Sequence, residues 1–269
     1  MAVACSSGTF HQLPLEFALR GIRKIGFKHV DLLAIEGWCH ISPADAVTNV
    51  DKVDRRLQKA LDATGLELDA FNMGFSPALH DRDADARLQR REQAAAMAEL
   101  MSRYHLTAAT LVPGQPDPDL ATDVLVERSI ASLQEIMAIT RPLSLTICLE
   151  CHVNSIMEDP IVAARVLDAV PGLMVAYDPS HLIMQEIPLE DTGALLERTG
   201  RVHLRDAAPG EMQVRWGRGD LDLDQVLKLL RQHGYSGGYS IEILDPWGSR
   251  AARKDAVAVR EALAERGVS

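Results

Sequence analysis

A chain of 269 residues with 47% apolar and 25% charged residues has enough material for one sizeable globular domain. The formal net charge of −10 provides no basic surface for nucleic-acid backbones or anionic membranes, so we expect neither as a partner. No basic segment followed by a long apolar run stands at the start, and no stretch approaches the roughly 20 apolar residues of a membrane span. The cysteines lack zinc-finger spacing and indicate reduced thiols, so we expect a cytoplasmic protein.

Short β-favouring runs alternate with amphipathic helical stretches from the start of the chain. In the first half, strands are predicted at residues 1–5, 29–33, 66–72 and 106–112. The helices that follow them are predicted at residues 13–25, 51–64, 83–104 and 120–140. A long loop over residues 34–49 separates the second strand from its helix and carries Trp38.

The second half repeats this alternation. Its predicted strands are residues 145–150, 175–178, 201–204 and 239–242, and its predicted helices are residues 160–170, 189–199, 222–234 and 250–266. Strict alternation implies an α/β protein with a parallel sheet, and eight units imply a (β/α)8 TIM barrel that forms a single domain over residues 1–269. A doubly wound open sheet is the alternative, but the first strand–helix turn lacks the Gly-rich dinucleotide fingerprint.

Four of the later strands end at or beside residues that can hold a divalent cation. Glu150, Asp178, His203 and Glu242 follow one another at intervals of 28, 25 and 39 residues, about one strand, one helix and two loops. A single acid at a strand end is usually a helix N-cap or a surface charge. In a parallel barrel, however, the C-terminal strand ends converge on one face, so three carboxylates and one imidazole would meet there. The spacing therefore predicts a metal site.

The donor set also limits which cation is expected. Three oxygen donors and one imidazole suit one hard to borderline divalent cation, namely Mn²⁺, Mg²⁺ or Co²⁺. A structural zinc site would normally contain more sulfur or histidine. Because side chains alternate along a strand, His152 is expected above Glu150, and Arg205 above His203.

Over its whole length the chain resembles the xylose isomerase-like barrels, specifically the sugar phosphate isomerase/epimerase group that includes ketose 3-epimerases, and the resemblance is specific only in the second half. The motifs that carry the resemblance are Leu149-Glu150-Cys151-His152, Asp178-Pro179-Ser180-His181, Val202-His203-Leu204-Arg205-Asp206, Gly217-Arg218-Gly219-Asp220-Leu221-Asp222 and Ile241-Glu242. The resemblance implies that Glu150, Asp178, His203 and Glu242 are the metal ligands. It also implies that His181 contacts substrate oxygens and that the protein is a homo-oligomer.

Proton transfer beside a carbonyl group fits these residues. The reaction needs a base, an acid and a group that stabilises the enediolate oxygens, and a divalent cation supplies the last of these. Glu150 and Glu242 would flank the cation, and one would remove the proton while the other returns it. We therefore expect a metal-dependent isomerase or epimerase acting on a small carbohydrate-like substrate, phosphorylated or free. The candidate substrate-binding residues are His181, His152, Arg205, Arg218 and Trp38.

Several alternatives stay open or are disfavoured by particular residues. A lyase or dehydratase acting on a hydroxy-carbonyl substrate would use the same ligands. An abasic-site nuclease of this fold needs further histidines, but residues 214–217 lack an Asp-x-His pair and Pro113 follows the fourth strand. A xylose-type isomerase needs a bridging lysine, and residues 151–157 contain none. A metal-free binding barrel is the remaining alternative.

Overall fold

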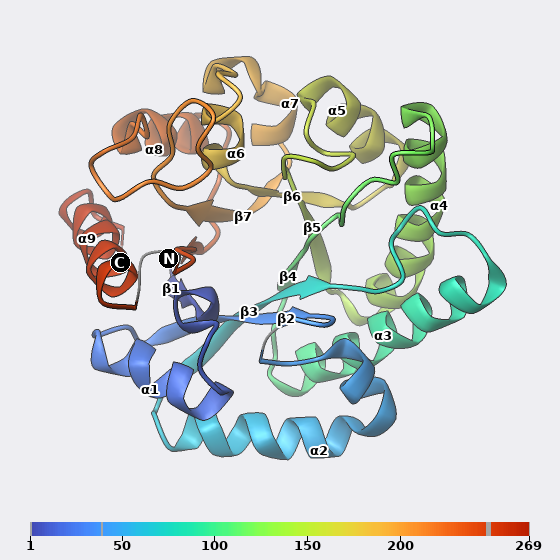
Figure 1. Cartoon of the computed structure of the whole chain (residues 1–269), viewed down its shortest axis with the longest axis horizontal. Helices are drawn as coiled ribbons and strands as arrows, with labels where there is room; N and C mark the ends of the chain where they lie inside the picture. Colours follow the sequence, from blue (N-terminus) through green and yellow to red (C-terminus); the bar gives the residue numbers. More distant parts are fainter. Residues whose placement is uncertain (1, 39, 246–248, 269) are drawn as a thin grey trace.

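Eight parallel strands pair in sequence order and close into a barrel, in which β8 pairs with β1. In this computed structural model the described residues are 2–38, 40–245 and 249–268. The helices form a ring around the strands (Figure 1). The strands are β1 (Val3–Ser6), β2 (His29–Ile35), β3 (Glu67–Gly74), β4 (Ala108–Leu111), β5 (Thr146–Glu150), β6 (Met174–Tyr177), β7 (Thr199–Leu204) and β8 (Tyr239–Ile241). The predicted single-domain TIM barrel is confirmed.

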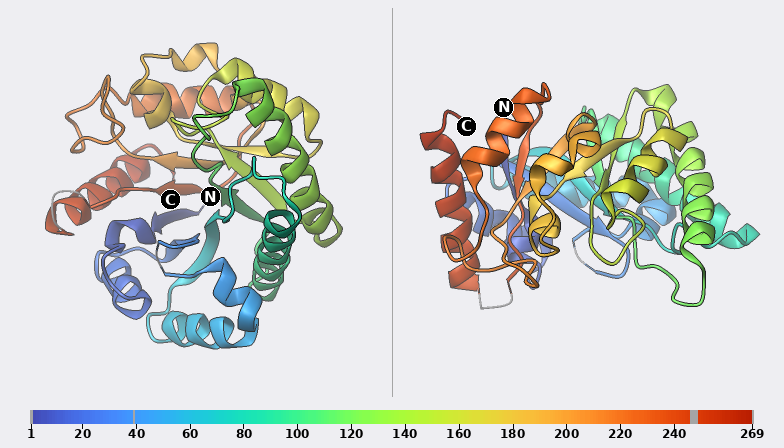
Figure 2. Two further views of the ribbon diagram at one scale, coloured as in Figure 1. Left: turned by 45° about the vertical axis from the view of Figure 1, so that its right-hand side comes forward. Right: turned by 90° about the horizontal axis from the view of Figure 1, so that it is seen from above.

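The helices alternate with the strands, and two further views show them around the barrel (Figure 2). They are α1 (Leu15–Lys24), α2 (Pro43–Asp62), α3 (Ala84–Arg103), α4 (Thr122–Thr140), α5 (Pro160–Ala169), α6 (Pro179–Ile183), α7 (Gly193–Leu196), α8 (Leu223–Gln232) and α9 (Ser249–Glu265). Short 3-10 turns are η1 (Ser7–Phe10), η2 (Arg141–Leu143) and η3 (Leu189–Asp191). The helices bury apolar residues at helical spacing, as α8 does with Leu223, Val226, Leu227 and Leu230.

The loop predicted over residues 34–49 is shorter in the structure, because α2 begins at Pro43. The hydroxyl of Ser42 accepts a hydrogen bond from the backbone N–H of Asp45 at 3.2 Å, and proline is well tolerated in the first turn. Asn49 interrupts the helix with non-helical backbone angles. The helix predicted at residues 51–64 matches the part of α2 that follows this interruption, and the first turns of α2 lie in the segment predicted as a loop.

The helix predicted over residues 189–199 is divided into η3 and α7, and Thr199 already belongs to β7. The hydroxyl of Thr192 donates a hydrogen bond to the carbonyl oxygen of Leu189 at 2.7 Å. Side chain–backbone bonds of this kind compete with helical bonding, which accounts for the break. A separate short helix, α6, directly follows β6 and was not predicted.

The cysteines of the described residues are buried and unpaired, as expected from their spacing. Burial raises the pKa of Cys5 and of Cys148 to about 12, so both stay as unreactive thiols. Cys39 lies outside the described residues. No helix within residues 2–38, 40–245 and 249–268 has both the length and the apolar character needed to span a membrane.

Candidate metal centre

The structure brings together the four residues that were predicted at the strand ends. Glu150 is the last residue of β5, Asp178 follows β6, His203 lies in β7 and Glu242 follows β8. One potential ligand atom from each lies within 4.8 Å of every other, and all four residues are buried. Because the strands are parallel and adjacent, their C-terminal ends place these side chains at one point.

His203 lies between two of the carboxylates. Its Nδ1 atom is 3.0 Å from Oε1 of Glu150 and 3.2 Å from Oε2 of Glu242. Burial by itself lowers the pKa of His203, but the two carboxylates outweigh burial and raise it well above its usual value. Burial likewise opposes ionisation of Glu150, yet the hydrogen bond and charge of His203 lower the pKa of Glu150 to about 2.

Asp178 has two roles in the geometry. Its Oδ1 accepts a hydrogen bond from the backbone N–H of Ser180 at 2.9 Å and so caps α6. Its Oδ2 accepts a hydrogen bond from Arg205 at 2.7 Å. Burial raises the pKa of Asp178, but the charge of Arg205 and other nearby positive charge bring it below its usual value. Asp178 is therefore both the N-cap of α6 and a member of the four-residue group.

Glu242 is oriented from the opposite side of the barrel. Its Oε1 accepts a hydrogen bond from Nδ2 of Asn72 in β3 at 2.9 Å. Its Oε2 faces His203 and also lies 3.6 Å from the guanidinium of Arg205. Burial raises the pKa of Glu242, but the charge of His203 outweighs it, and the pKa is lowered overall. The carboxylate is therefore ionised and held in one orientation.

Arg205 places a second positive charge beside the carboxylates. It is 2% exposed, and its guanidinium also donates to Oγ of Ser180 and to Nε2 of His181, both at 2.9 Å. Nearby carboxylates, Asp178 first, raise the pKa of Arg205 in spite of its burial. These contacts are consistent with the expected position of Arg205 above His203.

The donor set fits a divalent cation. Three buried carboxylates next to each other repel unless positive charge compensates them. Arg205 supplies one positive charge, and a divalent cation would supply two, which leaves the group neutral when His203 is an uncharged ligand. Carboxylate oxygens with a single imidazole are the ligands that hard to borderline cations prefer.

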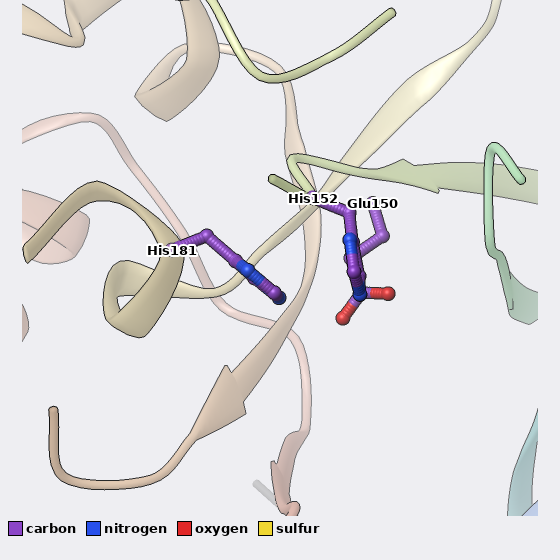
Figure 3. A group of neighbouring side chains, drawn as sticks. All are labelled: Glu150, His152 and His181. Carbon is purple, nitrogen blue, oxygen red and sulfur yellow. The ribbon is translucent and has the colours of Figure 1, made fainter. Parts of the chain in front are cut away.

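A second cluster lies beside this group and shares Glu150. Potential ligand atoms of Glu150, His152 and His181 lie within 4.8 Å of one another, and His181 extends from α6 toward the other two (Figure 3). The two imidazole rings have their centroids 4.1 Å apart. Burial lowers the pKa of His181 to about 4, so its ring is neutral and Nε2 accepts the hydrogen bond from Arg205.

Two other predicted substrate-binding residues do not join the buried group. Trp38 is 47% exposed, and its ring lies 5.9 Å from that of His11. Arg218 is exposed, and its backbone N–H donates to Asp206 at 3.2 Å. Among the described residues, no hydrogen bond or ion pair joins either side chain to the four-residue group.

Sequence reasoning missed three polar residues on the other half of the barrel. Asp31 in β2 and Thr110 in β4 lie near Nε2 of His203, and Asn72 in β3 holds Glu242. Only Asp31 gave a signal, since an acid interrupts the otherwise apolar run of its strand. The apolar pattern predicted the strand that contains Asp31, but it gave no indication that Asp31 lies beside His203.

The fold and the position of the buried group define a TIM barrel whose polar residues lie at the C-terminal strand ends, where enzymes of this fold carry their active sites. Residues 19–265 match the family described as xylose isomerase-like TIM barrel, and the chain belongs to this family. No curated protein matches the chain.

Solved structures with the same fold include three whose names state an activity or a ligand. D-allulose 3-epimerase from Methylomonas sp. has a TM-score of 0.77 at 16% identity, with 99% of this chain and 98% of that chain covered. The 3-keto-D-glucoside 4-epimerase from E. coli has a TM-score of 0.74 at 17% identity, with 97% and 99% covered. The IolI protein with a bound zinc atom has a TM-score of 0.73 at 18% identity, with 100% and 98% covered.

Proposed function

We propose that the protein is a divalent-metal-dependent isomerase or epimerase that moves a proton on a carbon beside a carbonyl group of a small carbohydrate. The observation that carries this proposal is the meeting of Glu150, Asp178, His203 and Glu242 within 4.8 Å at the C-terminal strand ends. These four residues would hold one cation, Mn²⁺, Mg²⁺ or Co²⁺. The solved structures support a divalent cation in this fold, since the IolI protein binds zinc.

The roles of the side chains follow from their positions. When bound, the cation supplies Lewis-acid stabilisation of developing negative charge on substrate oxygens. Glu150 and Glu242 lie on either side of His203, so one carboxylate can accept the substrate proton while the other returns it. Arg205 and His181 lie beside Asp178, where they would bind and orient substrate oxygens, with His152 next to them.

The proposed substrate is a free or phosphorylated sugar, or a related polyol-ketone. The names of the solved structures support this class, because two of them are epimerases of a ketose and of a keto-glucoside. The net charge of −10 also favours a small molecule over a nucleic acid. Roles in substrate binding for Trp38 and Arg218, and assembly into a homo-oligomer, stay predictions.

Proton exchange in D₂O tests the proposed reaction. The Mn²⁺-loaded protein is incubated with a panel of ketoses, aldoses and their phosphates, next to a chelator-treated control, and the substrates are then examined by NMR. Metal-dependent deuterium at one carbon, together with a new isomer, is the expected result. Elimination of water or of a leaving group would replace the isomerase with a lyase. No exchange, with no cation retained on elemental analysis, would leave a binding barrel.

Substitution of the two glutamates tests their roles. Glu150→Gln and Glu242→Gln each keep the side-chain size but remove the base, so turnover should fall by about 10²- to 10⁴-fold. Both should also bind Mn²⁺ more weakly, with an unchanged circular dichroism spectrum. Glu197→Gln, at an exposed glutamate, is the matched control and should leave turnover unchanged. Full activity in both site variants would contradict the proposal.

A further inference from the structure

A row of ionisable residues leads from His203 toward the opposite side of the barrel, and of these Asp31 and Arg201 are buried while Asp69 is partly exposed. Oδ2 of Asp31 lies 3.6 Å from Nε2 of His203, and 3.8 Å from a guanidinium nitrogen of Arg201. The same nitrogen of Arg201 donates to Oδ2 of Asp69 at 2.6 Å. Asp31 is fully buried, and within the described part of the chain neither of its carboxylate oxygens has a hydrogen-bond partner. A buried carboxylate without hydrogen bonds is costly, so its position calls for an explanation.

The orientation of the His203 ring explains why a carboxyl group lies at this position. Nδ1 faces Glu150 and Glu242, so it is the nitrogen that faces the proposed cation. A neutral imidazole that offers its Nδ1 lone pair carries its proton on Nε2. That N–H points away from the cation and needs an acceptor. The oxygens near it are Oγ1 of Thr110 at 3.1 Å and Oδ2 of Asp31 at 3.6 Å.

We infer that Asp31 is a positioning residue that fixes His203 as a metal ligand, with its carboxyl group behind the Nε2 side of the ring. The inference rests on the proposed metal site. Carboxylates behind ligating histidines fix the ring orientation and the tautomer, and they increase the basicity of the nitrogen that binds the metal. Thr110 lies against the same nitrogen and limits the rotation of the ring.

A different role for Asp31 is that of a counter-ion for Arg201 alone. Asp69 allows the two roles to be separated, because it also pairs with Arg201, whereas the ion pairs of His203 among the described residues are with Asp31, Glu150 and Glu242. If Asp31 serves only Arg201, Asp31→Asn and Asp69→Asn should have similar effects. If Asp31 positions His203, only Asp31→Asn should weaken cation binding.

The test is a calorimetric titration of the metal-free protein and both variants with Mn²⁺ alone. We expect a 10- to 100-fold higher dissociation constant for Asp31→Asn and a change of less than about threefold for Asp69→Asn. Equal affinity in Asp31→Asn and the unsubstituted protein, or equal losses in both variants, would overturn the inference while the metal site stands. Absence of Mn²⁺ binding in the unsubstituted protein would overturn the proposed function and the inference with it.

A second measurement needs no variant of Asp31. In the Zn²⁺-loaded protein with ¹⁵N-labelled histidine, NMR reports which ring nitrogen carries the proton. His203, assigned by the loss of its signals in His203→Gln, should carry it on Nε2, with Nδ1 unprotonated. A proton on Nδ1 would overturn the inference even if Asp31→Asn failed to fold.

Discussion

Single residues set the charge balance of the site. His203 and Arg205 place two positive charges among three buried carboxylates, so Glu150, Asp178 and Glu242 can be ionised together before any cation binds. Arginine keeps its charge, whereas the imidazole can lose its proton and become a ligand. The two basic residues therefore differ in kind: Arg205 is a permanent counter-charge, and His203 exchanges a proton for the cation.

His40 leads to a prediction about stability and pH. Its Nδ1 lies 2.9 Å from the hydroxyl of Ser7, and its Nε2 lies 3.2 Å from the carbonyl oxygen of Leu13. Burial lowers the pKa of His40 from 6.5 to about 4. Between these two pH values the unfolded chain binds a proton that the folded chain does not, so stability falls as the pH falls from above 6.5 to about 4.

His40→Gln should remove this contribution, which amounts to about 2 kcal/mol. The measurement is the free energy of unfolding by denaturant at pH 7 and at pH 4.5, for both proteins. The loss on acidification should be smaller in the variant by about that amount. Parallel pH profiles for the two proteins would contradict the assignment, and other acid-titrating groups cancel in the comparison.

The four residues at the strand ends could be predicted because their position follows from local sequence. An apolar run that ends at or beside an acid or a histidine places that residue at the mouth of a parallel barrel whatever the neighbours are. Asp31 and Asn72 could not be assigned in this way. Their partners, His203 and Glu242, come from strands across the barrel, and only the closed structure brings them together.

At the scale of elements, the loop between β7 and α8 is organised by one carboxylate. Asp206 accepts hydrogen bonds from the backbone N–H groups of Ala207, Gly217, Arg218, Gly219 and Leu221. Asp206 follows Arg205 directly after the end of β7. The same strand end therefore positions both the guanidinium of Arg205 in the site and the carboxylate that holds the loop. Hydrogen bonds to a charged acceptor are stronger than those between neutral groups.

Gly219 should be the most sensitive glycine of this loop. A Cβ atom at this position would lie 2.2 Å from the carbonyl oxygen of Ala207 and 2.3 Å from Oδ1 of Asp206. Gly219→Ala must therefore displace the loop and break several of these hydrogen bonds, at a cost of about 2 to 4 kcal/mol in the free energy of unfolding.

The matched control is Gly193→Ala, since a Cβ atom at Gly193 would meet no heavy atom of the described residues within 4 Å outside its own helix backbone and chain neighbours. Chemical denaturation of both variants should give a lower midpoint for Gly219→Ala and no loss for Gly193→Ala. Equal midpoints for Gly219→Ala and the unsubstituted protein would contradict the role assigned to Asp206.

Element boundaries could be predicted where apolar periodicity and an end signal coincide. The helix predicted at residues 83–104 forms α3 (Ala84–Arg103), with Asp83 as its N-cap. The helix predicted over residues 189–199 is broken, because its apolar pattern continues through a segment where Thr192 bonds locally. The apolar periodicity of a sequence indicates which face of a helix is buried. It gives no information about a side chain that competes with the helix for backbone hydrogen bonds.

At the scale of the molecule, the candidate ligands and the residues that support them come from different halves of the barrel. Strands β5 to β8 carry the four candidate ligands, and β2 to β4 carry Asp31, Asn72 and Thr110, which support two of these ligands from behind. The barrel is closed, so each supporting residue reaches its ligand across the interior. A cation at this point would connect four neighbouring strands and, through the supporting residues, the three strands opposite.

Cation binding should therefore stabilise the whole barrel in one cooperative step. A ligand that binds only the folded chain stabilises it by about 2.7 kcal/mol at one hundred times its dissociation constant. For a chain of 269 residues that corresponds to an increase in Tm of about 5 °C. Calorimetric scans with Mn²⁺ in this excess should give a single transition at higher temperature, and a chelator should reverse the shift. In Glu242→Gln the same Mn²⁺ concentration should give a smaller shift, because one ligand is neutral. An equal shift in that variant would place the bound Mn²⁺ elsewhere on the molecule.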